Sequence, residues 1–222
     1  MVPQHPIHQR LGKGFSLIEL LVVCAILAAL AFLTLPLGSS LLEHNREVRC
    51  ASKMTTLANA IFLYAAEHGG RLPPAHLDGT GTRPDNVWTH VIHPYLGVQG
   101  NSEPEITRKM SPHLACPAER ARENWNPPSQ FWHTHYGVNG SGPLTFNFDG
   151  SSQRPSLDQP SRTMMLIETR NARGVRARTS SIASIVARHN GLANVVFFDG
   201  HLEKRDLASI PSNGGDPFWK EW

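Results

Sequence analysis

One carboxylate stands inside a long apolar stretch near the start of the chain. Residues 15–37 read F-S-L-I-E-L-L-V-V-C-A-I-L-A-A-L-A-F-L-T-L-P-L, and Glu19 is the one charged residue among them. A stretch of about 20 residues can cross a bilayer as a helix. An ionised carboxylate at mid-bilayer costs about 2.5 to 3.5 kcal/mol on insertion scales, and less near the end of a span. Glu19 therefore needs a partner.

The spacing offers an α-amine as that partner. A cut between Gly14 and Phe15 would place the new amine of Phe15 about one helical turn from the Glu19 carboxylate. A neighbouring subunit that is shifted along its axis could bring its own amine equally near. The segment K-G-F-S-L-I-E-L-L-V-V, residues 13–23, resembles the class III signal of type IV pilins and type II secretion pseudopilins. In that family a leader ends in Gly, Phe follows, and Glu stands fifth after the cut.

This resemblance implies processing and assembly. A prepilin peptidase would cleave after Gly14 and methylate the amine of Phe15, and Glu19 would neutralise that amine during assembly. The helix would then serve as membrane anchor and filament core. The implied partners are the prepilin peptidase, other pilin or pseudopilin subunits, the inner-membrane assembly machinery and the lipid bilayer.

An ordinary signal peptide and a plain membrane anchor are the alternatives. A signal peptide would be cut after its apolar run at an A-x-A-like site, whereas Pro36 and Gly38 follow this run. A plain anchor would need no Glu19. Arg10 and Lys13 favour a cytoplasmic N-terminus, so we expect a single-pass inner-membrane protein whose head is periplasmic or lies on the filament surface.

Cysteines supply the next candidates for chemistry. Cys24 lies in the apolar stretch, where we expect it to serve as a small buried apolar residue. Cys50 and Cys116 would both face an oxidising periplasm, where a disulfide can persist. The sequence does not give the distance between them, so it leaves open whether they are bridged.

A motif near the C-terminus contains two residues, His189 and Asp199, that could form a catalytic or metal-binding pair. The segment R-H-N-G-L-A-N-V-V-F-F-D-G-H, residues 188–201, resembles the H-x9-D-G motif of a group of prepilin-type proteins whose biochemical role is poorly defined. If residues 193–198 form a strand, His189 and Asp199 stand about 20 Å apart at its two ends. We therefore expect no shared site. Asp199 and Gly200 are predicted to form a turn, and the role of the motif stays open.

Metal ligands at matched spacing are scarce. His90 and His93, or His133 and His135, could share one face and hold Zn²⁺, but neither pair has a carboxylate or Cys at matched spacing, and surface or partly buried histidines are the favoured interpretation. The resemblance to major pseudopilins also raises a structural Ca²⁺, for which Asp149, Asp158 and backbone carbonyls could supply oxygens. We predict no other cofactor. The sequence contains no G-x-S-x-G motif, phosphate-binding loop or H-E-x-x-H motif, and we predict that the chain is not an enzyme.

The elements that must position these residues follow from periodicity. Apolar residues recur at three- and four-residue spacing up to residue 65, and Gly69 with Gly70 then supplies a stop. This pattern predicts one long helix from about residue 16 to 67, bent at Pro36. We predict a leader (1–14), a transmembrane helix (15–38), a periplasmic half of the long helix (39–68) and a loop-rich α+β head (69–222).

The head is predicted to end in a small antiparallel sheet. A compact apolar run at 163–168 indicates one strand, and Asn-Gly and Asp-Gly between strand-like runs indicate type I′ hairpin turns. We expect a three-stranded meander from about residue 182 to 205, with residues 163–168 beside it and its apolar face on helix residues 54–65. Residues 86–97 are predicted as a short helix ending near Pro94, and residues 100–160 as loops with a few short strands. The fold class is α+β and pilin-like.

These expectations converge on one function and leave two rivals. The chain of 222 residues has a formal net charge of +3, which by itself implies no polyanion, and no nucleic acid partner is expected. The predicted function is a pseudopilin-like subunit of a type II secretion or type IV pilus-like filament. One rival is a non-polymerising, membrane-anchored periplasmic protein that binds a glycan through its Arg- and aromatic-rich head. The other is a membrane-anchored, metal-dependent hydrolase that uses the histidines.

Overall fold

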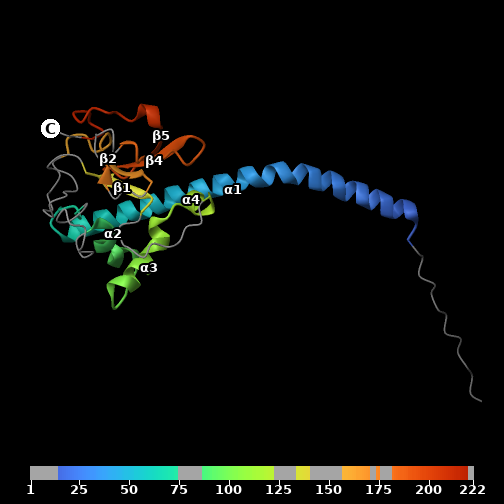
Figure 1. The fold of residues 1–222 in the computed structure, drawn as a ribbon, viewed down its shortest axis with the longest axis horizontal. Helices are drawn as coiled ribbons and strands as arrows, with labels where there is room; N and C mark the ends of the chain where they lie inside the picture. Colours follow the sequence, from blue (N-terminus) through green and yellow to red (C-terminus); the bar gives the residue numbers. More distant parts are fainter. Residues whose placement is uncertain are drawn as a thin grey trace, which may run out of the picture. The chain divides into compact units, whose positions relative to one another are not determined.

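The computed structural model describes residues 15–74, 87–122, 134–140, 157–170, 174–175 and 182–219, with backbone alone for residues 33–40 and 120–122. It consists of two compact units, Met1–Leu42 and Glu43–Trp222. We call the second unit the head. Figure 1 shows the helices and strands that build it.

The first helix, α1 (Leu17–Glu67), confirms the prediction of one long helix. It ends at Gly69 and Gly70, whose φ angles of 66° and 83° suit glycine, and Gly70 N–H donates to Ala65 O at 2.7 Å. In the part of the chain whose side chains are described, we find no helix that is both long and apolar enough to cross a membrane. The bend at Pro36 and the span over 15–38 fall partly on residues described by backbone alone, and both stay predictions.

Among the described residues, four helical segments lie between α1 and the first strand, and two of them correct the sequence analysis. Helix α2 (Trp88–Val91) and the 3₁₀ turn η2 (His93–Leu96) form the short helix expected near residues 86–97, with Pro94 inside the 3₁₀ turn rather than at the helix end. Helices α3 (Glu103–Leu114) and α4 (Pro117–Arg122) lie where loops were predicted.

The reason for the missed helix α3 is its composition. Prolines at 104 and 112 suggest a loop, but Pro104 occupies the first turn, where it costs no helical hydrogen bond. Ile106, Met110 and Leu114 then recur every four residues and are buried. Packing of this apolar face outweighs the poor helix propensity of the prolines.

The sheet contains five strands: β1 (Tyr136–Asn139), β2 (Met164–Glu168), β3 (Gly174–Val175), β4 (Leu192–Phe197) and β5 (Leu202–Asp206). Their order is β3-β1-β2-β4-β5. Strands β1, β2, β4 and β5 pair antiparallel. The pairing of β2, β4 and β5 was predicted, and β1 falls among the few short strands expected between residues 100 and 160. The two-residue β3 joins β1 in parallel and was not foreseen. The α+β, pilin-like fold class is confirmed.

An irregularity in β2 decides which way its side chains face. The β2–β4 register shifts between Met164 and Leu166, as at a β-bulge. Met164 packs in the apolar cluster on the far side of the sheet from α1, whereas both Met165 and Leu166 pack in the cluster that contains α1. Glu168 lies opposite Tyr136 of that same cluster in the β1–β2 register. The bulge therefore turns Glu168 toward α1.

The two predicted hairpin turns differ in type. Asn190 and Gly191 have φ angles of 54° and 82°, and His189 and Leu192 bond to each other across them, which agrees with a type I′ turn. At the second turn Gly200 has a φ of 90°, but Asp199 does not have a positive φ. Gly200 N–H donates to Phe197 O at 2.9 Å, as in a three-residue connection ending in a left-handed glycine. The type I′ prediction was wrong for this turn.

The strand predicted before Asn190, as the first of the meander that starts near residue 182, was also wrong. The segment before Asn190 contributes only isolated bridges, from Ile185 to Thr169 and from His189 to Leu192. Arg188 and His189 of this segment are buried and make polar contacts.

The sheet separates two apolar clusters. One cluster packs the α1 residues Met54, Leu57 and Ile61 with residues of β1, β2 and β4, so the predicted packing of the sheet on helix residues 54–65 is confirmed. The other cluster contains Phe218 and Trp219 from the C-terminal segment, which lies beyond the opposite face of the sheet in Figure 1. Elements from both halves of the sequence thus enclose the sheet on two sides.

Candidate functional sites

The N-terminal site is built by the first turn of α1. Ser16 N–H donates to Glu19 Oε2 at 2.9 Å, and Glu19 N–H donates to Ser16 Oγ at 3.3 Å. This reciprocal pair is a capping box, in which S-x-x-E satisfies amide groups that a helix start leaves without partners. The Glu19 carboxylate consequently faces the N-terminal end of the helix. Phe15 directly precedes the cap, and Gly14 lies outside the described residues.

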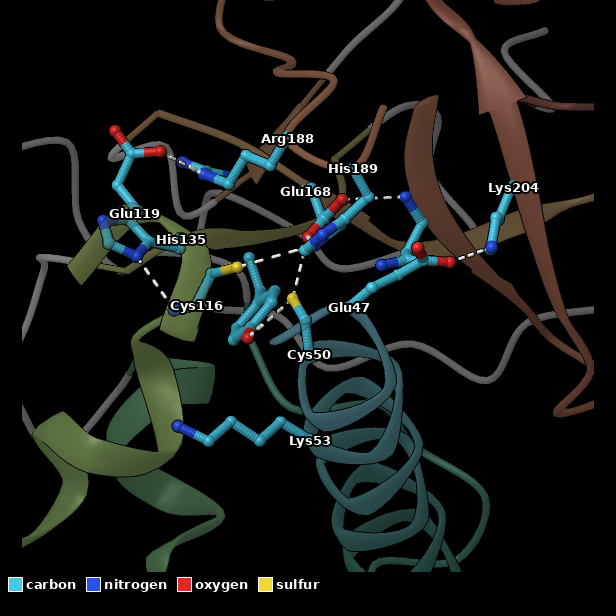
Figure 2. Close-up of polar contacts among 12 residues, drawn as sticks. Glu47, Cys50, Lys53, Cys116, Glu119, His135, Glu168, Arg188, His189 and Lys204 are labelled. Atoms are coloured by element: carbon cyan, nitrogen blue, oxygen red, sulfur yellow. Dashed lines mark hydrogen bonds and ion pairs between the residues drawn. The ribbon is translucent and has the colours of Figure 1, made fainter. Parts of the chain in front are cut away.

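A second candidate site lies inside the head and joins four distant segments. Cys50 comes from α1, Cys116 from the residue before α4, Glu168 from the end of β2, and His189 from the turn before β4. Their ligand atoms all lie within 4.8 Å of one another. We call these four residues the buried cluster, and Figure 2 shows them facing one another between α1 and the sheet.

Glu168 is the centre of the buried cluster. Cys50 Sγ donates to its Oε1 at 2.8 Å, and His189 Nε2 lies 3.0 Å from the same oxygen. The other oxygen, Oε2, accepts the backbone N–H of Asn194 at 2.8 Å. One oxygen therefore faces the cluster while the strand β4 holds the other.

The two thiols complete the arrangement. Cys116 Sγ lies 3.6 Å from His189 Nε2, and Cys50 Sγ lies 3.2 Å from Tyr136 Oη. Backbone Cys116 N–H donates to His135 Nδ1 at 2.9 Å, which fixes the position of the residue before α4. All four cluster residues are 0–1% exposed. Bulk solvent therefore contributes little to the solvation of these polar groups.

Burial and hydrogen bonding move the pKa values of the cluster in opposite directions. Burial raises the pKa of Cys50, and its contacts with Cys116 and Glu168 raise it further. The hydrogen bond with Cys50 lowers the pKa of Cys116, against the effect of burial, and His189 lowers it further. Burial lowers the pKa of His189, but Cys116 and Glu168 outweigh this and raise it to about 9. The contact between Cys116 and His189 thus favours the charged form of each group, whereas burial opposes it.

This geometry argues against a catalytic nucleophile. In a catalytic triad the two ring nitrogens of His serve different partners, whereas His189 Nε2 alone faces both Cys116 and Glu168. The thiol is also fully buried. The arrangement is suited to holding a cation or to linking the segments of the head.

Polar contacts at one side of the buried cluster support its position. Arg188 Nε donates to Glu119 Oε2 at 2.5 Å, and Arg188 also donates to the backbone oxygen of Thr169 at 2.6 Å. These bonds join α4, the end of β2 and the segment before β4. Arg188 and Thr169 directly neighbour His189 and Glu168 in the sequence, and Glu119 lies three residues after Cys116. Figure 2 shows the pair of Arg188 and Glu119 beside the buried cluster.

The structure brings some of the predicted site residues together and keeps others apart. Cys50 and Cys116 come together as free thiols. His189 and Asp199 do not share contacts, because His189 reaches Glu168 whereas Asp199 Oδ1 pairs with His201 Nδ1 at 2.5 Å.

Of the two histidine pairs considered as zinc ligands, His90 and His93 both lie within the described residues. The rings of His90 and His93 lie 5.3 Å apart in an edge-to-face arrangement, and His93 Nδ1 bonds Val98 O at 2.8 Å. His133 and Asp149 lie outside the described residues, and Asp158 is exposed. Calcium binding stays a prediction.

Sequence reasoning missed Glu168 as a site residue. The sequence feature that could have indicated this residue is a carboxylate at the end of the apolar run Met164–Ile167. The strand that contains both is buried throughout. A charge at such a position is rarely left without a partner. The identity of its partners, however, depends on segments up to 118 residues away along the chain.

The fold and the N-terminal site together define an α+β, pilin-like protein, and comparison with known families agrees at the N-terminus. Residues 10–35 match the family described as the prokaryotic N-terminal methylation motif. The chain thus carries a type IV pilin-like signal, which covers Gly14, Phe15 and Glu19. No curated protein matches the chain, and no solved structure does. The resemblance of residues 188–201 to the H-x9-D-G motif stays a prediction.

Proposed function

We propose that the chain is a prepilin-type, pseudopilin-like subunit. In this proposal a prepilin peptidase removes residues 1–14 and methylates Phe15. Residues 15–38 anchor the subunit in the inner membrane, and the N-terminal helix assembles with others into a type II secretion or type IV pilus-like filament. The head lies in the periplasm or on the filament surface and is not an enzyme. The observation that carries the proposal is the methylation motif over residues 10–35.

The capping box supports a role for Glu19 in assembly. Its carboxylate already accepts a hydrogen bond from Ser16 N–H, and Phe15 is one residue, or about 3.8 Å of Cα trace, further back. After cleavage, the charged amine of Phe15 and the partial positive charge of the helix start would both favour an anion at this place. The carboxylate could serve its own amine or that of a neighbouring subunit.

The surface of the N-terminal helix supports lateral packing. Large apolar side chains there are 46–83% exposed: Phe15, Leu17, Ile18, Leu20, Leu21, Val22, Val23, Ile26, Leu27, Leu30 and Phe32. A continuous apolar surface of this kind marks a membrane or protein contact in a stable molecule. Lipid would cover it before assembly, and neighbouring helices would cover it in a filament.

The first test is the intact mass and N-terminal residue of the protein purified from its native membrane. We expect a chain that begins at methylated Phe15. A chain that retains residues 1–14, or one that is cut after Pro36, would contradict the proposal.

The second test separates anchoring from assembly. Glu19→Ala should remain in the membrane fraction but fail to enter filaments, because the Phe15 amine would be buried without a counter-charge. Glu43→Ala is the matched control, since it removes a carboxylate from the same helix outside the apolar stretch. Equal filament incorporation of Glu19→Ala and the wild type would contradict the assigned role of Glu19.

A further inference from the structure

We propose that the head binds one Zn²⁺ ion through the four side chains of the buried cluster: Cys50, Cys116, Glu168 and His189. The site is structural and closed. It links α1, the start of α4, the end of β2 and the turn before β4. This proposal is independent of the filament function, because it concerns only the interior of the head.

The distances suit a tetrahedral zinc ion. Zinc binds sulfur at about 2.3 Å and nitrogen or oxygen at about 2.0–2.2 Å, so neighbouring ligand atoms of a tetrahedron lie about 3.3 to 3.8 Å apart. In the buried cluster, Cys116 Sγ lies 3.6 Å from His189 Nε2, and Glu168 Oε1 lies 3.0 Å from that nitrogen. All ligand atoms fall within 4.8 Å of one another. Small side-chain rotations would therefore complete the tetrahedron.

The ligand types favour zinc among the common metals. Thiolate ligands select zinc, copper(I) or iron–sulfur centres, imidazole suits zinc, and a carboxylate oxygen is an accepted zinc ligand. Calcium and magnesium prefer sites made of oxygen atoms alone. The two sulfurs of the buried cluster therefore disfavour both metals. Zinc would displace the protons of Cys50 and Cys116 and bind both as thiolates.

Neighbouring groups already hold the ligands in a binding arrangement. Asn194 N–H holds Glu168 Oε2 at 2.8 Å, which leaves Oε1 directed into the cluster. Tyr136 Oη lies 3.2 Å from Cys50 Sγ and can donate to a thiolate there. Such outer contacts orient metal ligands and strengthen binding.

The site leaves no position for chemistry on a substrate. Four protein ligands fill a tetrahedral zinc, whereas a catalytic zinc keeps one position for water or substrate. All four residues are buried. The zinc would therefore stabilise the head by joining Cys50 to Glu168 across 118 residues of chain.

The decisive measurement is the metal content of the full chain, purified without chelator, reductant or added metal. Inductively coupled plasma mass spectrometry should find about one zinc per chain. In the native protein, Cys50 and Cys116 should resist alkylation, and both should react after unfolding in EDTA. Absence of zinc together with failure to bind added ZnCl₂ would overturn the proposal.

A disulfide is the main rival, because the two sulfurs are close enough to pair after a small movement. Intact mass under non-reducing conditions separates the two. The zinc site requires both thiols in reduced form, whereas a Cys50–Cys116 bridge makes the chain lighter by two hydrogens and would overturn the proposal. Stoichiometric iron or copper in place of zinc would overturn it as well.

Substitutions assign the ligands. Glu168→Gln and Cys116→Ser should each retain less than about one tenth of the wild-type zinc at limiting free zinc. Cys24→Ser is the matched control, since Cys24 is an exposed thiol outside the cluster, and it should keep the full zinc content. Undiminished zinc in Cys116→Ser would overturn the assignment.

Cobalt substitution of the wild-type chain gives a readout that does not depend on the folding of a variant. Co²⁺ in this site should show thiolate-to-metal charge-transfer bands together with the intense d–d bands of a tetrahedral complex. Weak octahedral bands without thiolate charge transfer would overturn the proposal.

Discussion

The guanidinium of Arg188 donates from Nε to Glu119 Oε2 at 2.5 Å inside the head. The side chains are 1% and 11% exposed, so this ion pair is nearly removed from water. Arg188 also bonds the backbone oxygen of Thr169. The pair thereby ties α4 to the strand β2 and to the segment that carries His189.

Loss of this ion pair should destabilise the head strongly. Glu119→Ala leaves the Arg188 guanidinium buried without its counter-charge, and we expect the free energy of unfolding to fall by about 3 to 5 kcal/mol. Chemical denaturation of the purified chain measures this. Glu105→Ala removes the more exposed pair with Lys109, which has a 2.7 Å contact, and should change stability little. Equal effects of the two substitutions would contradict the assigned importance of Arg188 and Glu119.

Lys53 should stabilise the end of α3. Its ammonium donates to Pro112 O at 2.6 Å and to Ala115 O at 2.9 Å, where helix carbonyls lack partners. Lys53→Met keeps the apolar stem but removes both bonds, and we expect thermal or chemical denaturation to show a loss of about 1.5 to 3 kcal/mol. Arg108→Met, at an exposed position of α3, is the control and should leave stability nearly unchanged. If Lys53→Met left the free energy of unfolding unchanged, water would be replacing the ammonium at both carbonyls without cost, and the prediction would be wrong.

Gly200 should be sensitive to replacement because of its backbone and not because of its surroundings. Its φ is 90°, while a Cβ there would meet Phe62 Cε2 only at 3.7 Å, an ordinary contact. Gly200→Ala should therefore cost about 1 to 2 kcal/mol of stability, measured by denaturation. Gly215→Ala is the control, because that glycine does not have a positive φ. Similar stability of the two variants would argue against a left-handed turn at Gly200.

Asp199 and His201 should shift each other's pKa values in opposite directions. Burial lowers the pKa of His201, but its hydrogen bonds with Asp199 and Glu203 outweigh this and raise it above the usual value. The Phe197 ring stacks on the imidazole with centroids 4.4 Å apart. A proton NMR titration should find His201 above about pH 6.5, the ordinary value, and Asp199→Asn should lower it. A wild-type His201 that titrates below that value would contradict the pairing.

The sign of the effect on stability follows from these directions. A raised pKa of His201 means that its contribution is fully present below about pH 6.5 and is lost as the pH rises through the folded-state pKa. Burial raises the pKa of Asp199, but its bonds with His201 lower it on balance, so its contribution is lost as the pH falls through that lowered value. His113, whose pKa is lowered by burial and by Lys53, is the internal control and should not respond to Asp199→Asn.

Local sequence patterns were enough for the features that depend on contiguous residues. The signal around Gly14, Phe15 and Glu19 could be recognised because its chemistry requires neighbours in the chain, and the later match over residues 10–35 agrees with it. Apolar periodicity predicted α1, and the Asn190–Gly191 pair predicted a tight turn with positive φ. Helix α3 was not predicted, because its two prolines indicate a loop although its buried apolar residues recur every four positions.

The tertiary structure alone decided the buried cluster. Sequence patterns suggest which face of a helix or strand is apolar, but they do not say which faces meet. The bulge in β2 turns Glu168 toward α1, and the turn at Asn190 brings His189 to the same place. Cys50 and Cys116 were candidates from the start, but their common partner was fixed only when α1 packed on the sheet. Contacts between segments 118 residues apart arise from burial of shared apolar surface, which no local spacing encodes.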